Sequence, residues 1–291
     1  MISKISKASI SIIIAIVIVC CLCLLSCKKS EVSTTIKTEQ EEAAAALPES
    51  EAEAETTQQE EKEEVLTESE TSEASETQEE TAETIKNGEV TFKAEDGIEL
   101  NGNIFGQGNK WVVLSHMYPT DQTSWFDFAK ELAGRGYVAL TFDFRGYGKS
   151  KGNKDDIPNI DKDIKAAIAY VKQYDYEKLF LIGASMGGTA TIVAAAEEDV
   201  SGVVTLAAPD KMGNDMDALA VVSKLKMPKI FISAKGDEYH AESANRLYEN
   251  AVEPKAIEII EGKAHGTFIF EEEPENAQTL KDIIFNFLDN N

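Results

Sequence analysis

From about residue 86 onward, short apolar segments alternate with segments whose apolar residues recur at helical spacing. The apolar segments cover residues 111–114, 137–142, 179–182, 203–207, 230–233 and 257–260. Apolar residues at consecutive positions are typical of strands buried in a parallel sheet. Helical spacing occurs at Ile164, Ile168 and Val171, and again at Leu280, Ile284 and Phe287. The pattern predicts an α/β fold, with a mostly parallel central sheet and helices on both faces.

Two further segments precede the parallel strands and differ from them. Residues 90–93 and 98–104 flank the dipeptide Asp96-Gly97, which is typical of a tight turn between antiparallel strands. The sequence therefore predicts an opening β-hairpin. In sheets of this class ligands bind at the carboxyl ends of the parallel strands, so residues just after each strand are the candidates for chemistry.

The first 27 residues have the pattern of a targeting segment. Lys4 and Lys7 precede an uncharged, mostly apolar run over residues 8–26. The run ends in Leu24-Leu25-Ser26-Cys27, which resembles the lipobox of bacterial lipoproteins. That resemblance implies a signal peptide over residues 1–27, lipidation of Cys27 and a membrane anchor in the cell envelope, with the folded domain outside the cytoplasm. Nineteen residues span about 28 Å as a helix, so an uncleaved signal anchor is the alternative.

A strongly acidic segment follows the leader. Residues 31–84 contain 19 Glu and two Lys, whereas the whole chain has a formal net charge of −24. Such a segment has too few apolar residues to offset chain entropy, and its like charges repel one another. We therefore expect a disordered tether over residues 28–85 and a folded domain over 86–291. The remaining domain is also acidic, which argues against nucleic acid as a partner.

Cysteine and histidine counts restrict the possible chemistry further. The four Cys occupy positions 20, 21, 23 and 27, so the folded domain contains no thiol. This excludes a disulfide framework, a Cys-based metal site and a Cys nucleophile in the domain. Only three His are present, at 116, 240 and 265. The sequence predicts no metal site and no cofactor.

The sequence around Ser185 is the strongest candidate for chemistry. Gly183-Ala184-Ser185-Met186-Gly187 lies directly between an expected strand and the helical run 189–196. A sharp strand-to-helix turn needs small residues on both sides of the serine, and it exposes the hydroxyl above the sheet. The alternative is a serine that only caps the helix. We predict that Ser185 is a nucleophile.

A serine nucleophile needs a base, and the base needs an orienting acid. Asp237 follows the strand at 230–233, and His265 follows the last strand. Both are therefore expected at the same sheet edge as Ser185, in the chain order Ser, Asp, His. Glu238 is a rival for the acid. His240 is expected to be exposed and is the weaker candidate for the base.

Over residues 86–291 the chain resembles the α/β-hydrolase superfamily. The resemblance depends on Leu114-Ser115-His116-Met117-Tyr118, on Asp143-Phe144-Arg145-Gly146-Tyr147-Gly148, and on the residues around Ser185, Asp237 and His265. It implies an oxyanion hole formed by the backbone N–H groups of Tyr118 and Met186, and a structural role for His116. Met117 stands where the family usually has Gly. A phosphate-binding role for the glycines after Arg145 is disfavoured, because no P-loop spacing is present.

The region that often holds a lid in this superfamily is short here. Residues 208–229 separate two parallel strands, and a helix over 215–224 accounts for much of the segment, so no lid domain is expected. The resemblance then implies a serine hydrolase that cleaves short-chain carboxylic esters through an acyl-enzyme. The alternatives are a peptidase or thioesterase with the same triad, and a catalytically inactive binding lipoprotein.

Overall fold

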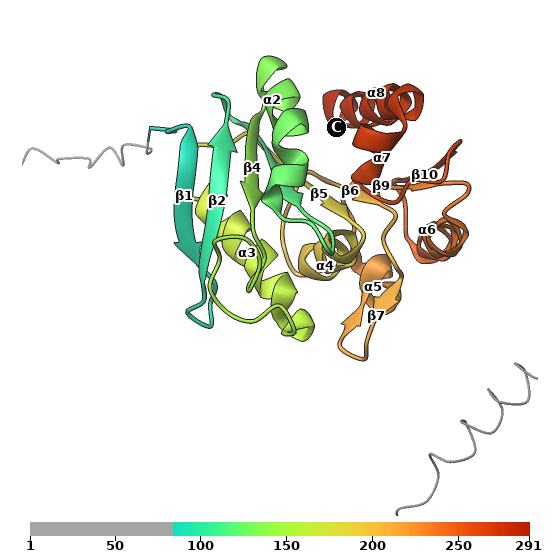
Figure 1. Ribbon diagram of the computed structural model, residues 1–291, viewed down its shortest axis with the longest axis horizontal. Helices are drawn as coiled ribbons and strands as arrows, with labels where there is room; N and C mark the ends of the chain where they lie inside the picture. Colours follow the sequence, from blue (N-terminus) through green and yellow to red (C-terminus); the bar gives the residue numbers. More distant parts are fainter. Residues whose placement is uncertain (1–83) are drawn as a thin grey trace, which may run out of the picture. The chain divides into compact units, whose positions relative to one another are not determined.

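A computed structural model describes residues 84–291, so the predicted signal peptide, Cys27 and most of the predicted tether lie outside the described residues. The central sheet has eight strands in the order β1-β2-β4-β3-β5-β6-β9-β10. Figure 1 shows β1 and β2 at one edge of this sheet and β10 at the other. The strands are β1 (Gly88–Lys93), β2 (Glu99–Phe105), β3 (Lys110–Ser115), β4 (Val138–Phe142), β5 (Lys178–Ala184), β6 (Gly202–Leu206), β9 (Lys229–Ala234) and β10 (Lys255–Ile260).

The pairing of the strands follows the sequence pattern. β1 and β2 form the predicted antiparallel hairpin, in which Gly97 has φ +85°, and β2 also pairs antiparallel with β4. From β4 to β10 all neighbouring pairs are parallel. Because parallel strands in one sheet point the same way, residues that follow β3, β5, β9 and β10 meet at one edge.

Helices cover both faces of the sheet, as predicted. They are α2 (Phe126–Gly134), α3 (Ile160–Val171), α4 (Met186–Ala195), α5 (Ala218–Val221), α6 (Glu238–Asn250), α7 (Phe268–Glu272) and α8 (Pro274–Asn290). Short 3₁₀ turns lie at Gln122–Trp125, Ile157–Asn159 and Val222–Lys224. No helix within residues 84–291 is both long and apolar enough to cross a bilayer.

Alternate residues of β3 belong to two separate apolar cores. Trp111 and Val113 belong to the core that includes residues of α3, α4 and α6, whereas Val112 and Leu114 belong to the core that includes residues of α2 and α8. This division explains why the central strands are apolar at consecutive positions: both of their faces are buried. The residues at the carboxyl ends of these strands are therefore held by strands that are packed on both faces.

Two segments differ from the sequence-based expectation. Residues 215–224 do not form one helix: β7 (Lys211–Met212) and β8 (Met216–Asp217) form a small hairpin around Gly213 at φ +64°, and α5 begins only at Ala218. The side chain of Asp217 caps α5 by accepting a hydrogen bond from the Ala220 N–H. The last strand, β10, is an edge strand with Glu258 and Ile259 exposed.

Candidate active site

Ser185 lies in a strained turn between β5 and α4. Its backbone has φ +46° and ψ −115°, one of two positive φ values among the described non-glycine residues. A Cβ at Gly183 would overlap the carbonyl of Gly187, and a Cβ at Gly187 would overlap the carbonyl of His116. The glycines are therefore required by close backbone approach, as the sequence predicts. A strained serine at the start of a helix is the arrangement expected of a nucleophile.

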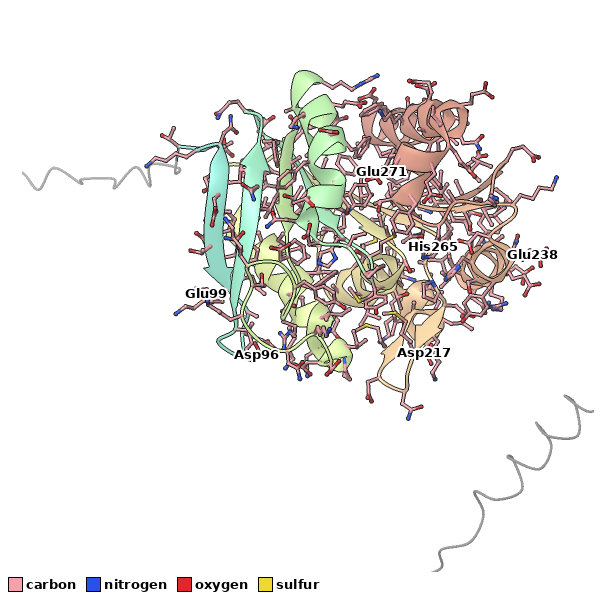
Figure 2. The ribbon with its side chains drawn as sticks, viewed as in Figure 1. Asp96, Glu99, Asp217, Glu238, His265 and Glu271 are labelled. Atoms are coloured by element: carbon pink, nitrogen blue, oxygen red, sulfur yellow. The ribbon has the colours of Figure 1, made fainter. Side chains whose placement is uncertain are left out.

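Asp237 and His265 are joined by a hydrogen bond, as the chain order predicts. Nδ1 of His265 lies 2.7 Å from Oδ2 of Asp237. Glu238, the rival acid, is exposed, and Figure 2 shows it at the outer edge of the domain with His265 further inside. The structure therefore pairs Asp237, and not Glu238, with His265.

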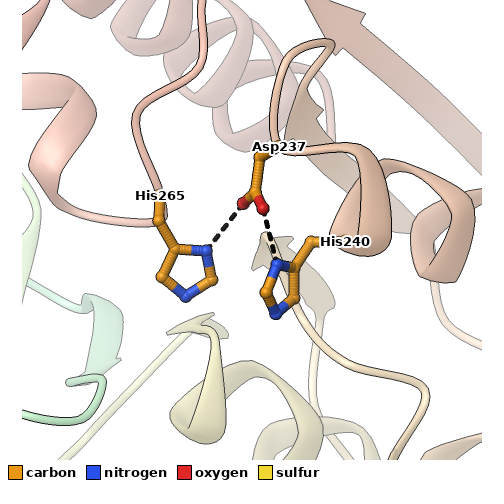
Figure 3. Close-up of side chains that lie close together, drawn as sticks. All are labelled: Asp237, His240 and His265. Carbon is orange, nitrogen blue, oxygen red and sulfur yellow. Dashed lines mark hydrogen bonds and ion pairs between the residues drawn. The ribbon is translucent and has the colours of Figure 1, made fainter. Parts of the chain in front are cut away.

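His240 is not the exposed residue that the sequence suggests. Its side chain is 20% exposed, and its Nδ1 lies 2.7 Å from Oδ1 of Asp237. The imidazoles of His240 and His265 lie side by side, with ring centroids 4.2 Å apart (Figure 3). Asp237 is the N-cap of α6, and His240 lies three residues later. Residues at this spacing lie on the same face of a helix, so His240 faces the site together with Asp237.

The two imidazoles determine the ionisation of Asp237. Burial by itself raises the pKa of this carboxyl, but the hydrogen bonds from His240 and His265 outweigh burial and set the pKa at about 2. Asp237 is therefore a carboxylate at neutral pH. Because a carboxylate only accepts hydrogen bonds, both imidazoles must donate Nδ1–H to it.

The residues predicted for the oxyanion hole lie next to the serine. Met186 follows Ser185 at the start of α4, and Tyr118 lies in the loop after β3. Both line the same cavity as Ser185. Met117, which replaces the usual Gly, is fully buried, and its sulfur packs against the backbone of Gly266. Met117 thus supports the loop that carries His265, a role that the sequence did not reveal.

His116 has the structural role that the sequence predicts. It is fully buried, its Nε2 accepts a hydrogen bond from the Phe144 N–H, and its Nδ1 bonds the carbonyl of Met117. Burial lowers its pKa, so that the ring is neutral. With both ring nitrogens bonded to backbone, His116 fixes the loop after β3 against the loop after β4.

The turn after β4 contributes one side of the site. The Arg145 guanidinium is buried and forms ion pairs with Asp163, Asp96 and Asp156 at 2.7–2.9 Å. Three carboxylates occupy its donors, which supports the expectation that this turn does not bind phosphate. The neighbouring Tyr147 ring packs edge-on against His116 at 5.0 Å and lines the cavity.

A cavity of about 600 Å³ lies over Ser185. This volume is within the usual range for small-molecule sites. Its apolar walls are Tyr118, Tyr147, Ile157, Pro158, Met186 and Met212, and its polar lining is Ser185, Asn214, Asp215, His240 and His265. Met212, Gly213, Asn214 and Asp215 come from the β7–β8 hairpin, so this hairpin forms one wall where the sequence predicted only a connecting helix.

The structure brings Ser185 and His265 to one cavity without joining them. The hydrogen bonds found within residues 84–291 do not include one from the Ser185 hydroxyl to His265. Catalytic contacts of this kind often tighten only when substrate binds. Of the predicted site residues, Asp237 and His265 are directly bonded, and Ser185, Tyr118 and Met186 surround them.

Potential metal ligands also meet at this site, against the expectation from the three scattered histidines. Among the described residues, Asp237, His240 and His265 form a group whose ligand atoms lie within 4.8 Å of one another. The spacing of His240 three residues after Asp237 is the only sequence signal that could have revealed it.

Comparisons with known proteins agree with this architecture. A family model described as serine aminopeptidase of the S33 type matches residues 106–222, which include Tyr118 and Ser185. The chain is 31% identical over 98 residues to the 2-hydroxy-6-oxononadienedioate/2-hydroxy-6-oxononatrienedioate hydrolase of Escherichia coli. That match covers 33% of this chain, and the chain spans about a third of the length of these curated relatives, 34%.

Solved structures share the fold over most of the described residues. The α/β hydrolase GrgF from Penicillium sp. sh18 superposes with a TM-score of 0.62 at 18% identity, covering 71% of this chain and 99% of that one. The Pyrococcus furiosus esterase Pf2001 gives 0.60 at 19% identity, covering 70% and 93%. Strand order, the tight turn at Ser185 and the structural neighbours lead to one assignment: residues 84–291 form an α/β-hydrolase fold.

Proposed function

We propose that this protein is a serine hydrolase that cleaves carboxylic esters of short acyl chains through an acyl-enzyme intermediate. The observation that carries the proposal is the 2.7 Å hydrogen bond between Asp237 and His265, beside a strained Ser185 in one cavity. The E. coli relatives and several structural neighbours are named as hydrolases or esterases, which supports the reaction class.

In the first half of the reaction, the Ser185 hydroxyl attacks the ester carbonyl carbon. Nε2 of His265 accepts the hydroxyl proton, while Nδ1–H of the same ring donates to Asp237, which stabilises the imidazolium that forms. The backbone N–H groups of Tyr118 and Met186 donate to the oxyanion. Each such donor is worth about 3 kcal/mol of transition-state stabilisation.

The imidazolium then returns its proton to the leaving alcohol, and the ester bond breaks to give the acyl-enzyme, which completes the first half. In the second half, His265 takes a proton from water as the water oxygen attacks the acyl carbon, and the imidazolium returns that proton to Oγ of Ser185 as the acyl–Oγ bond breaks and the carboxylic acid leaves. The apolar walls of the cavity receive the acyl group.

A fluorophosphonate probe tests the proposal, because it forms a stable bond only with an activated serine. We expect the full chain to be labelled once, at Ser185, and Ser185→Ala to remain unlabelled. Thr189→Ser is the matched control and should be labelled as the parent is, because the hydroxyl of residue 189 lies one turn further along α4 and donates to the carbonyl of Pro209. Absence of labelling on a folded chain would favour the inactive binding lipoprotein.

A second candidate is hydrolysis of the amide bond of short peptides or of thioesters with the same machinery. The family model that matches residues 106–222 is described as a serine aminopeptidase, and Asp215 lines the cavity, where its carboxylate could bind the ammonium group of a free peptide N-terminus. Rates on aminoacyl p-nitroanilides and on p-nitrophenyl acetate separate the two functions. A preference for the anilide that Asp215→Asn abolishes would favour the peptidase.

We also propose that the protein is a lipoprotein of the cell envelope, with the catalytic domain outside the cytoplasm. The support is the sequence that ends in Leu24-Leu25-Ser26-Cys27. An uncleaved signal anchor would place the domain on the same side of the membrane, so the substrate class proposed here is the same in both cases.

A further inference from the structure

We infer that His240 and His265 form a chelating site for a divalent cation of the Zn²⁺ class, and that a bound cation reversibly blocks the reaction proposed for Ser185. The site shares His265 with the proposed catalytic residues, whereas His240 has no part in the proposed mechanism. The inference on inhibition depends on the proposed function, whereas the inference on binding does not.

The first support is the orientation of the two rings. Each imidazole donates Nδ1–H to a different oxygen of Asp237 over 2.7 Å. A neutral ring that donates from Nδ1 keeps a free lone pair on Nε2. Figure 3 shows that Nε2 of both rings faces away from Asp237, on the same side. A carboxylate that orients a histidine in this way is the usual surrounding of a metal-bound imidazole.

The second support is the spacing of the rings. Zn–N bonds are ~2.0–2.1 Å long, so one tetrahedral ion joins two nitrogens that are about 3.4 Å apart. The ring centroids are 4.2 Å apart and the ring planes meet at 47°. The rings are hydrogen-bonded to the same carboxylate and lie at this distance, so rotation of the side chains can bring both Nε2 lone pairs to one ion.

The third support is the charge of the cavity. Its lining contains the carboxylate of Asp215 and no lysine or arginine. Two basic side chains on the adjoining elements are already paired, Lys211 with Asp217 and Arg246 with Asp210. Nothing in the described lining therefore opposes a cation, and two imidazoles select Zn²⁺, Cu²⁺ or Ni²⁺ over Mg²⁺ and Ca²⁺.

The chemical step is a ligand exchange without any redox change. The two Nε2 lone pairs replace two water molecules of the hydrated ion, and no proton is released because both Nδ1–H groups remain on Asp237. Nε2 of His265 is then coordinated and cannot accept the proton of Ser185. Water or the Ser185 hydroxyl can fill the remaining positions, since Ser185 lines the same cavity.

Imidazole NMR tests the binding directly, because the whole chain has only three histidines, at 116, 240 and 265. On the untagged full-length Ser185→Ala chain, we expect one equivalent of Zn²⁺ to shift the Cε1–Hε1 signals of His240 and His265. The His116 signal is an internal control, since both of its nitrogens bond backbone groups. Addition of Mg²⁺ should shift neither. Unchanged His240 and His265 signals, or equal shifts of all three, would overturn the site.

Equilibrium dialysis against Zn²⁺ provides the quantitative test. The Glu-rich segment is identical in all variants, so any Zn²⁺ that it binds cancels in a comparison of the variants. We expect His240→Gln and His265→Gln each to weaken Zn²⁺ binding at least tenfold, and Asp237→Asn to weaken it by about 10- to 100-fold. Glu242→Gln, a carboxylate on the same helix, is the matched control and should bind as the parent does. Equal affinity of parent and His240→Gln would refute the proposal.

Kinetics then decide whether the ion inhibits. We expect micromolar Zn²⁺ to inhibit ester hydrolysis reversibly, with recovery after a chelator is added. His240→Gln, compared with its own rate in the absence of metal, should lose at least tenfold in sensitivity. Zn²⁺ bound at the two imidazoles without loss of rate would contradict both the inhibition and His265 as the base. A chain without hydrolase activity that still shows the NMR shifts would contradict only the proposed function.

Discussion

Nδ1 of His240 lies 2.7 Å from Oδ1 of Asp237, so that this carboxylate bears one imidazole on each oxygen. The arrangement holds the pKa of Asp237 at about 2, against an ordinary value of 3.8. A carboxyl whose pKa is lower in the folded chain than in the unfolded chain stabilises the fold at any pH above its unfolded pKa, and this stabilisation disappears as the pH falls through its folded pKa. The stabilisation from Asp237 is therefore lost between about pH 4 and pH 2.

Replacement of His240 by Phe should reduce the stabilisation that Asp237 contributes, and narrow the pH range over which it is lost. Without this hydrogen bond the pKa of Asp237 rises toward 3.8, so the variant should lose roughly 1 kcal/mol of unfolding free energy above pH 4. The difference from the parent should vanish below pH 2. Urea unfolding at several pH values measures it, with Glu238→Gln as the control. A constant difference at every pH would mean that His240 acts by packing alone.

Ser185, Asp237 and His265 should behave as one unit in kinetics. Ser185→Ala and His265→Ala should each lower turnover by a factor on the order of 10⁴ to 10⁶, and the double variant should be little worse than either single one. Asp237→Asn should cost about 10⁴-fold, because the imidazole loses its orienting carboxylate. Glu238→Gln, on the exposed side of α6, is the matched control. Additive losses, or a larger loss from Glu238→Gln than from Asp237→Asn, would disprove this triad.

Gly187→Ala should damage the site through the loop after β3. The new Cβ would overlap the carbonyls of His116 and Ser115, so the loop that carries Tyr118 must move. We expect a loss of about 1–3 kcal/mol in unfolding free energy, as for other overpacked positions, together with lower kcat. Gly134→Ala is the control, since a Cβ there meets nothing within 4 Å and favours the helix. Thermal unfolding that ranks the two variants equally would contradict this account.

Short acyl esters should be preferred over long ones. The wall over the cavity is a hairpin of two-residue strands, and residues 208–229 contain no lid domain. A palmitoyl chain would leave many methylenes in water, and each of these would lose the binding free energy of about 0.8 kcal/mol that burial provides. We expect a higher kcat/KM for p-nitrophenyl acetate or butyrate than for the palmitate, with no increase in rate above the solubility limit. A clear preference for palmitate would show that the hairpin opens to a longer groove.

Cys27→Ser should release the protein from membranes. Lipidation would be blocked, and the remaining cysteines, at 20, 21 and 23, lie within the expected signal peptide. Membrane fractionation and intact-mass measurement check this prediction, with Cys23→Ser as the matched control. A mature chain that retains Met1, or one that begins at another residue than Cys27, would favour the signal anchor.

The succession of the main strands along the chain and the position of the tight turn at Ser185 could be predicted from the sequence alone. Consecutive apolar residues in β3, β5 and β6 predict burial on both faces, and glycines on both sides of Ser185 predict a turn too tight for any side chain. These properties are local, since hydrophobic periodicity and the backbone conformations that glycine allows depend on a few neighbouring residues. The placement of Asp237 and His265 followed because the carboxyl ends of parallel strands share one edge.

The orientation of α6 and the form of residues 211–217 depend on contacts between distant segments, so they could not be predicted from the sequence. His240 could be exposed or inward on sequence grounds; the packing of α6 against β9 turns it toward Asp237. Residues 211–217 contain a turn at Gly213-Asn214 between two short strands, which are stabilised by pairing with each other and by the Asp217 cap of α5. The apolar spacing of residues 215–224 predicted a helix there instead. β10 has the composition of a buried strand, yet no strand follows it in the sheet. Contacts between segments distant in sequence fix these features, and local composition does not encode them.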